Sequence, residues 1–187
     1  FQGDYYSFTL MTPFFNPGPI ENPNIPVYLS ALNPYMLRVA GEVCNGVYLH
    51  GFNTPKFTQE VILPNLEAGA KRGGRSLKDL DIIAGGFIVT GKNEEEVEKN
   101  RLAARTQLAF YGSTRSYSPV MKTHGWDDSF EKLYRMSVDG QWESMSNEIT
   151  EDMLNEFIIV GTYDDIIQKI KARFGSYATS ISFSIPI

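Results

Sequence analysis

The sequence contains one cysteine, Cys44, which excludes an internal disulfide framework and is typical of a reducing compartment. It contains no run of about 18 apolar residues, so no membrane-spanning helix is predicted. Basic side chains are outnumbered, 17 Lys and Arg against 22 Asp and Glu, so no basic face for nucleic acid is expected. These absences favour a cytoplasmic protein with neither a membrane nor a nucleic-acid partner.

Common catalytic and metal-binding motifs are also missing. The two histidines, His50 and His124, lie far apart, and together with one cysteine they give no metal-ligand spacing, so no metal site is expected. The sequence has no Ser-His-Asp motif, no phosphate-binding P-loop and no dinucleotide-binding GxGxxG. The acidic run Glu94–Glu96 is favourable at a helix start and indicates nothing more.

Residues 1–24 are predicted to form an extended, proline-rich segment. Prolines and turn residues recur through this stretch, and it has no helical periodicity. The chain begins at Phe1 rather than at a methionine, and its opening FQGDYYSF resembles the tail of an element that started earlier. We therefore expect the chain to be a fragment or a processed form.

The stretch from Ile25 to His50 reads as a βαβ unit of minimal length. Val27–Leu29 and Val47–Leu49 are the predicted strands. Between them, Asn33 is the expected N-cap of a helix, with Pro34 at its first position. The apolar face of this helix is predicted at positions i, i+3, i+4 and i+7, namely Met36, Val39, Ala40 and Val43.

Periodicity and caps define the remaining elements. The strongest strand is Asp81–Thr90, in which Gly85 and Gly86 indicate a bulge, a close backbone approach or room for a ligand. Two capping boxes predict helix starts: Asn93 with Glu96, for a helix to Tyr111, and Thr162 with Asp165, for a helix ending before Gly175. The other predicted elements are helices over 57–72, 127–137 and 150–157 and a last strand, Thr179–Ile185.

Strands that alternate with helices predict an α/β fold with a parallel sheet covered by helices. Four predicted strands in 187 residues correspond to half of a (β/α)8 TIM barrel, which usually needs about 250 residues. We therefore expect residues 1–187 to be a single partial domain. The helical region before the last strand is longer than one crossover requires, so residues 112–157 are predicted to be a helical insertion.

Several stretches, in this order along the chain, resemble the luciferase-like monooxygenase superfamily. They include FQGDYYSF, IPVYLSALNPYMLRVAGEVCNGV, AGGFIVTG and IIVGTYDDIIQKI. Further similarity in HGFNTPKFTQEVILPNLEAG and RTQLAFYGSTRSYSPVMKTHGW indicates a subgroup of deazaflavin (coenzyme F-420)-dependent oxidoreductases. The resemblance implies a TIM barrel, of which this chain is the C-terminal half with strands five to eight.

The resemblance also implies an activity and a cofactor site. The expected reaction is hydride transfer between coenzyme F-420, a deazaflavin, and a small organic substrate. The turn after the first strand would hold the phosphate tail of the cofactor; its residues are Ser30, Ala31, Leu32, Asn33, Pro34, Tyr35 and Met36. Many family members have a Gly-rich turn at this point and Asp-Gly where this chain has Asn45-Gly46. The strands that hold much of the ring-binding wall precede this half, so no catalytic residue is assigned.

Other interpretations remain open at this stage. The cofactor can instead be FMN in a true monooxygenase, or the chain can be a non-catalytic, truncated half barrel. His50 ends a strand, where it either lines a substrate pocket or packs structurally, whereas His124 is expected to be structural. Ser180, Ser182 and Ser184 are expected to face the barrel interior or to mark a half-solvated strand. Open strand edges predict a homo-oligomer.

Overall fold

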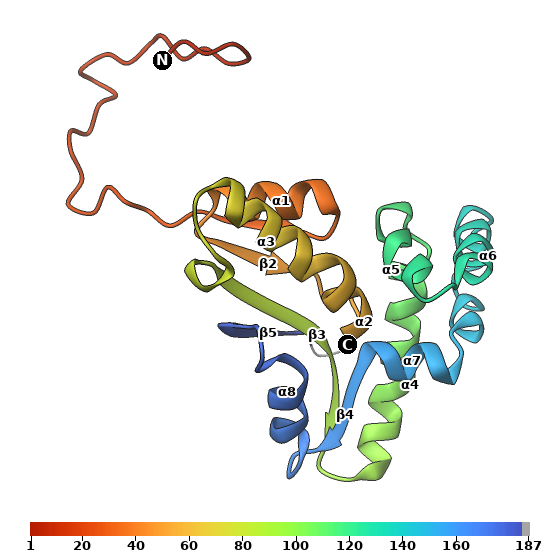
Figure 1. Ribbon diagram of the computed structural model, residues 1–187. Helices are drawn as coiled ribbons and strands as arrows, with labels where there is room; N and C mark the ends of the chain where they lie inside the picture. The colour runs from red at the N-terminus through yellow and green to blue at the C-terminus, as the bar shows by residue number, and fades with distance from the viewer. Residues whose placement is uncertain (185–187) are drawn as a thin grey trace.

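A parallel sheet organises the structure, a computed structural model that describes residues 1–184. Its five strands are β1 (Tyr28–Ala31), β2 (Gly46–Leu49), β3 (Asp81–Gly91), β4 (Ile158–Thr162) and β5 (Ser180–Ser184). β1, β2 and β3 lie side by side in chain order, and β5 pairs with β3 (Figure 1). The predicted α/β class is therefore confirmed. Its assignment to strands five to eight of a barrel stays a prediction, and Ile185 lies outside the described residues.

β4 is the strand that the sequence prediction missed. Phe87 of β3 pairs with Ile158 of β4 and also with Ser184 of β5, so β4 and β5 lie on opposite edges of β3. Ile83 pairs with β2 and β5 in the same way, so β4 continues the edge where β2 ends. The prediction failed because β4 follows a helix directly, without the Gly or Pro that usually separates two elements.

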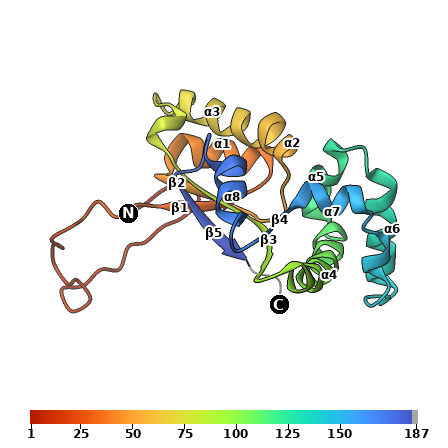
Figure 2. The same cartoon turned by 90° about the horizontal axis from the view of Figure 1, so that it is seen from below.

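Helices cover one face of the sheet and extend beyond one end of it (Figures 1 and 2). α1 (Pro34–Val43), α3 (Leu63–Arg72) and α8 (Ile166–Phe174) pack on the face formed by such residues as Val47, Ile82 and Ala84. The others are α2 (Pro55–Phe57), α4 (Glu94–Gly112), α5 (Ser118–Thr123), α6 (Asp127–Val138) and α7 (Glu151–Phe157); a π-helical turn, Thr58–Ile62, joins α2 to α3. Among residues 1–184, no helix is long and apolar enough to cross a membrane.

α1 turns a partly different face to the core from the one predicted, since Ala40 is the one predicted residue that is buried. Its buried residues are Leu37, Ala40 and Gly41, whereas Met36 is 38% and Val43 is 69% exposed. The cause is the close crossing with α3, where Gly41 lies against the backbone of Leu66. Only a residue without a side chain fits there, so a glycine, which the apolar pattern did not count, sets the buried face.

The helix starts only partly follow the predicted capping boxes. Asn93 accepts a hydrogen bond from the Glu96 N–H at 3.0 Å, but the Glu96 carboxylate accepts from Lys92 N–H rather than from Asn93. The second predicted box is wrong. Thr162 ends β4, and the Asp165 side chain forms an ion pair with Lys169 instead of capping α8.

The second face of the sheet is open over β1, β2 and β5. By register, Ser30, Tyr48, Ile83 and Ser180 lie in one row on this face, and Ser182 lies in the next. Ser30, Tyr48, Ser180 and Ser182 are exposed. This open face is thus polar as well as aromatic. The exposure of Ser180 and Ser182 fits both a barrel interior and a half-solvated strand, so the choice between the two stays a prediction; the side chain of Ser184 lies outside the described residues.

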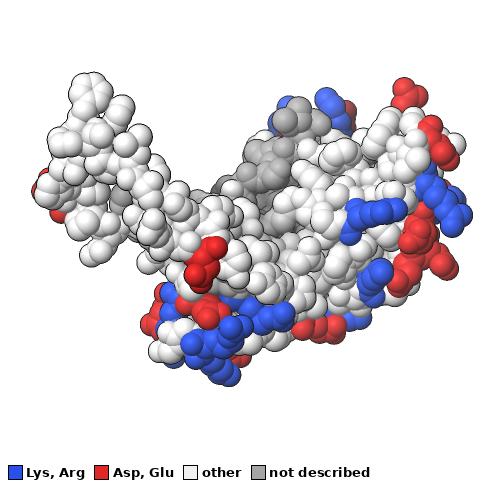
Figure 3. Space-filling view, turned by 90° about the horizontal axis from the view of Figure 1, so that it is seen from above, with Lys and Arg blue, Asp and Glu red and all other residues white. Residues whose placement is uncertain are grey.

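Residues 1–27 form an extended arm that leaves the body of the molecule (Figure 1). Within this stretch the only strand-like pairing is a single bridge between Gln2 and Ser7. Its charged side chains are Asp4 and Glu21 alone, and the space-filling view shows its surface as almost entirely uncharged (Figure 3). The arm exposes large apolar side chains, including Phe1, Tyr5, Tyr6, Phe14 and Phe15.

Candidate functional site

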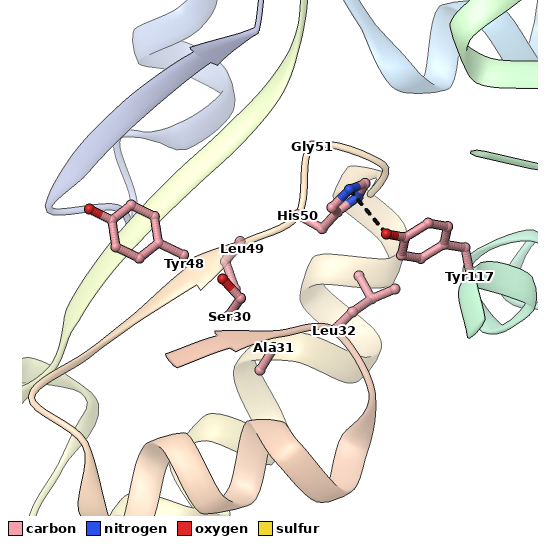
Figure 4. A pocket seen from close by; sticks show the side chains of 8 residues that line it. All are labelled: Ser30, Ala31, Leu32, Tyr48, Leu49, His50, Gly51 and Tyr117. Carbon is pink, nitrogen blue, oxygen red and sulfur yellow. Dashed lines mark hydrogen bonds between the residues drawn. The ribbon is translucent and has the colours of Figure 1, made fainter. Parts of the chain in front are cut away.

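A cavity of about 290 Å³ lies at the carboxyl ends of β1 and β2 (Figure 4). It is lined by Ser30, Ala31, Leu32, Tyr48, Leu49, His50, Gly51 and Tyr117. The end of β1 and the end of β2 are adjacent because the two strands pair in parallel, with Ala31 opposite Leu49. The structure therefore brings the first part of the predicted turn, Ser30–Leu32, together with His50.

Hydrogen bonds define the orientation and tautomer of His50. Its Nδ1 accepts the backbone N–H of Phe52 at 3.0 Å. Because a backbone N–H can only donate, Nδ1 carries no proton in the neutral ring, and the proton lies on Nε2. Nε2 lies 3.3 Å from the Tyr117 hydroxyl oxygen. Burial lowers the pKa of His50, so the imidazole is neutral at pH 7 and adds no positive charge to the cavity.

Two tyrosines that sequence reasoning did not select form the wall beside His50. The Tyr117 ring stacks on the imidazole at a centroid distance of 4.6 Å, and Tyr111 meets it edge-on at 5.0 Å. Tyr111 also lines a smaller cavity of about 120 Å³, together with His50, Gly51, Gly86 and Phe87. Both tyrosines lie in RTQLAFYGSTRSYSPVMKTHGW, the stretch that carried part of the family resemblance, and this was the one available signal.

The rest of the predicted turn lies beside the cavity rather than in its lining. Asn33 is the N-cap residue of α1, but its side chain makes no cap bond; its Nδ2 donates to the Ser116 carbonyl at 3.2 Å. Pro34 is the first residue of the helix, and Tyr35 is 71% exposed. The N–H groups of Tyr35 and Met36 belong to the first helical turn, where intrahelical acceptors do not exist.

The Gly85–Gly86 pair is explained by crowding on both faces of β3. A side chain at Gly85 would lie 3.3 Å from the Leu49 carbonyl oxygen, and one at Gly86 would lie 3.0 Å from the Phe174 ring. Asn53, which is buried, donates to the carbonyls of His50 and Gly85 and thereby ties the loop after β2 to β3. Small residues here let the loop that carries His50 approach the centre of the sheet.

His124 has structural contacts. Its Nε2 lies 2.8 Å from the hydroxyl of buried Thr54, and its ring stacks on Trp126 at 4.1 Å. Neither histidine takes part in a metal-ligand cluster, because residues 1–184 hold no group of three or more His, Cys, Asp or Glu side chains suited to a metal ion.

We expect the free energy of unfolding to fall when the pH is lowered below about 6.5. Burial lowers the pKa of both His50 and His124 from 6.5, so the unfolded chain binds these two protons more readily than the folded chain. The contribution of the two neutral histidines to the free energy of unfolding is fully present above pH 6.5. It is lost as the pH falls from there through their two lower folded-state pKa values. Urea unfolding at about pH 7.5 and about pH 5.5 measures the loss. The double variant His50→Gln/His124→Gln should lose less over this interval, and an equal loss would contradict the assignment.

Comparison with known proteins relates the chain to a family. The family model described as luciferase-like monooxygenase matches residues 1–180. An uncharacterized protein of Mycobacterium tuberculosis is 35% identical over 173 residues, which cover 92% of this chain and 51% of that protein. A 5,10-methylenetetrahydromethanopterin reductase of Methanopyrus kandleri is 31% identical over 169 residues, 90% of this chain and 47% of the reductase.

A solved structure agrees with these sequence matches. The coenzyme F420-dependent tetrahydromethanopterin reductase from Methanopyrus kandleri superposes with a TM-score of 0.68 at 31% identity, over 84% of this chain and 44% of that one. The chain spans about half the length of the curated relatives that it matches.

Proposed function

The chain belongs to the luciferase-like monooxygenase family, and we propose that the natural protein containing it is a coenzyme F420-dependent oxidoreductase. The proposed reaction is hydride transfer between the deazaflavin and a small organic substrate. At the family level this is supported by the similarity to a reductase whose structure is described as coenzyme F420-dependent. A luciferase-like protein that uses FMN and oxygen is the alternative within the family.

The observation that carries the proposal is the cavity at the ends of β1 and β2. Parallel α/β barrels place their working groups at the carboxyl ends of the strands, and this cavity joins the turn after β1 to His50 there. Three of its lining side chains, Ala31, Leu32 and Leu49, are apolar, and Ser30, His50 and Tyr117 contribute polar atoms. This mixture is typical of a site for a small organic molecule.

The residues at the start of α1 fit the anionic tail of a cofactor. The Tyr35 and Met36 N–H groups are free of intrahelical acceptors, the Asn33 side chain does not cap them, and a helix N-terminus favours an anion. We propose that these two N–H groups bind a phosphate oxygen, with the Ser30 hydroxyl nearby. A bound deazaflavin would supply or accept the hydride. The chain itself would position the tail at α1, keep His50 neutral and place the substrate against His50 and Tyr117.

Substituting Asn33 by leucine should weaken cofactor binding by about 1–2 kcal/mol. The change removes the bond from Asn33 to the Ser116 carbonyl, which holds the loop beside the cavity, and places an apolar side chain at the start of α1. A fluorescence titration of the natural protein with coenzyme F420 measures the effect. The same substitution at exposed Asn147, far along the chain, is the matched control and should leave the affinity unchanged.

The titration also separates the alternatives. An unchanged affinity in the Asn33→Leu variant would remove this turn from the proposed site. Tight binding of FMN without binding of coenzyme F420 would favour the monooxygenase, and binding of neither would favour a non-catalytic protein.

We further propose a homo-oligomer, because the outer edges of β1 and β5 have no partner strand within residues 1–184 and the arm exposes apolar side chains.

A further inference from the structure

Tyr117 is placed to present a hydrogen-bond donor to the cavity. It comes from the short 3₁₀ turn Arg115–Tyr117, and its hydroxyl reaches back to His50 across 67 positions in the sequence (Figure 4). The ring is held on three sides, by His50 at 4.6 Å, by Tyr111 at 5.8 Å and by Phe52 at 5.8 Å between ring centroids. Its position is thus determined by packing before any ligand binds.

The tautomer of His50 decides which way the Tyr117 hydroxyl can act. The Phe52 N–H occupies Nδ1, so the neutral imidazole has its proton on Nε2 and donates it to the Tyr117 oxygen. The Tyr117 hydroxyl oxygen then accepts the hydrogen bond from His50, and the hydrogen of the hydroxyl takes no part in this bond. Because Tyr117 lines the cavity, this hydrogen is available to a ligand.

We propose that Tyr117 is a specificity-determining residue that selects ligands carrying a carbonyl oxygen or an imine nitrogen. Such a group accepts the hydroxyl hydrogen, and the apolar Ala31, Leu32 and Leu49 side chains contact the body of the ligand. Carbonyl and imine groups are also groups that a hydride reduces. The inference therefore rests on the proposed function for its chemistry and names a substrate class for the same site.

A pair of nearly isosteric probes tests the selection in this chain. Acetophenone presents a carbonyl oxygen, and α-methylstyrene presents a CH₂ group in the same place. In a titration followed by NMR, acetophenone should bind more tightly, and Tyr117→Phe should weaken acetophenone binding about fivefold while leaving α-methylstyrene unchanged. Tyr5→Phe is the matched control, because Tyr5 is 92% exposed in the arm and is not among the residues that line the cavity.

Several outcomes would overturn the inference. An equal loss for both probes would mean that Tyr117 acts by packing, and no loss, or no binding of acetophenone, would mean that it does not select an acceptor. The ¹⁵N shifts of His50 give an independent measurement. A proton found on Nδ1 would make Nε2 the acceptor of the Tyr117 hydroxyl and leave no donor for a ligand.

These measurements need no cofactor, so the two proposals can fail separately. Coenzyme F420 binding with no effect of Tyr117→Phe on acetophenone would refute the specificity role alone. Discrimination between the probes by a protein that does not bind coenzyme F420 would support Tyr117 as a selector and refute the proposed function.

Discussion

Phe52→Ala should lower the free energy of unfolding by about 3–5 kcal/mol. Phe52 is fully buried, and its ring stacks on Phe157 at 4.4 Å, so the substitution leaves a cavity where the loop after β2 meets α7. Urea unfolding followed by circular dichroism measures the change. The effect is large because Phe52 connects the sheet to the helices that follow β3, and neither side can close the gap alone.

The same substitution should disturb the candidate site. Phe52 lies two residues after His50 and contacts the rings of Tyr111 and Tyr117. Its loss removes the packing that holds these two rings in place beside the cavity. Phe110→Ala is the control, because Phe110 is 53% exposed and its loss should change stability by less than about 1 kcal/mol. A similarly small change for Phe52→Ala would show that the helices after β3 do not depend on this contact.

Gly69→Ala should lower the free energy of unfolding by about 1–3 kcal/mol, although alanine is the better helix former. A methyl group at Gly69 would collide with the carbonyl oxygen of Arg38, part of the α1 backbone, so the two helices must separate. Lys71→Ala on the exposed side of α3 is the control and should stay within about 0.5 kcal/mol of the parent.

The measurement for Gly69→Ala is again the urea midpoint, with a thermal melt as a second readout. A variant as stable as the parent, or more stable, would mean that α1 and α3 are not in backbone contact. The outcome bears on the site as well, because α1 carries the helix start that is proposed to bind the cofactor tail. Separation of the helices would therefore also weaken the proposed binding of the cofactor.

Local patterns in the sequence were sufficient for most of the secondary structure. Short apolar runs predicted β1, β2 and β3, the alternation of apolar and polar residues predicted β5, and a cap predicted the start of the long helix α4, because such patterns depend on neighbours within about four positions. The same local reasoning placed His50 at the end of a strand. It also named the turn after β1, since a strand followed by a proline-initiated helix has few other interpretations.

The tertiary structure alone decided which residues meet at the cavity and which face of each element is buried. Tyr117 reaches His50 from 67 positions away, and no local pattern records such a contact. Gly41 and Gly69 determine which face of α1 is buried, because they let α1 and α3 cross in backbone contact. β4 forms a strand because it pairs with the part of the β3 edge that β2 leaves unpaired. The physical reason is the same in each case. Burial and hydrogen bonding are satisfied by neighbours in space, whereas the sequence reveals only the neighbours along the chain.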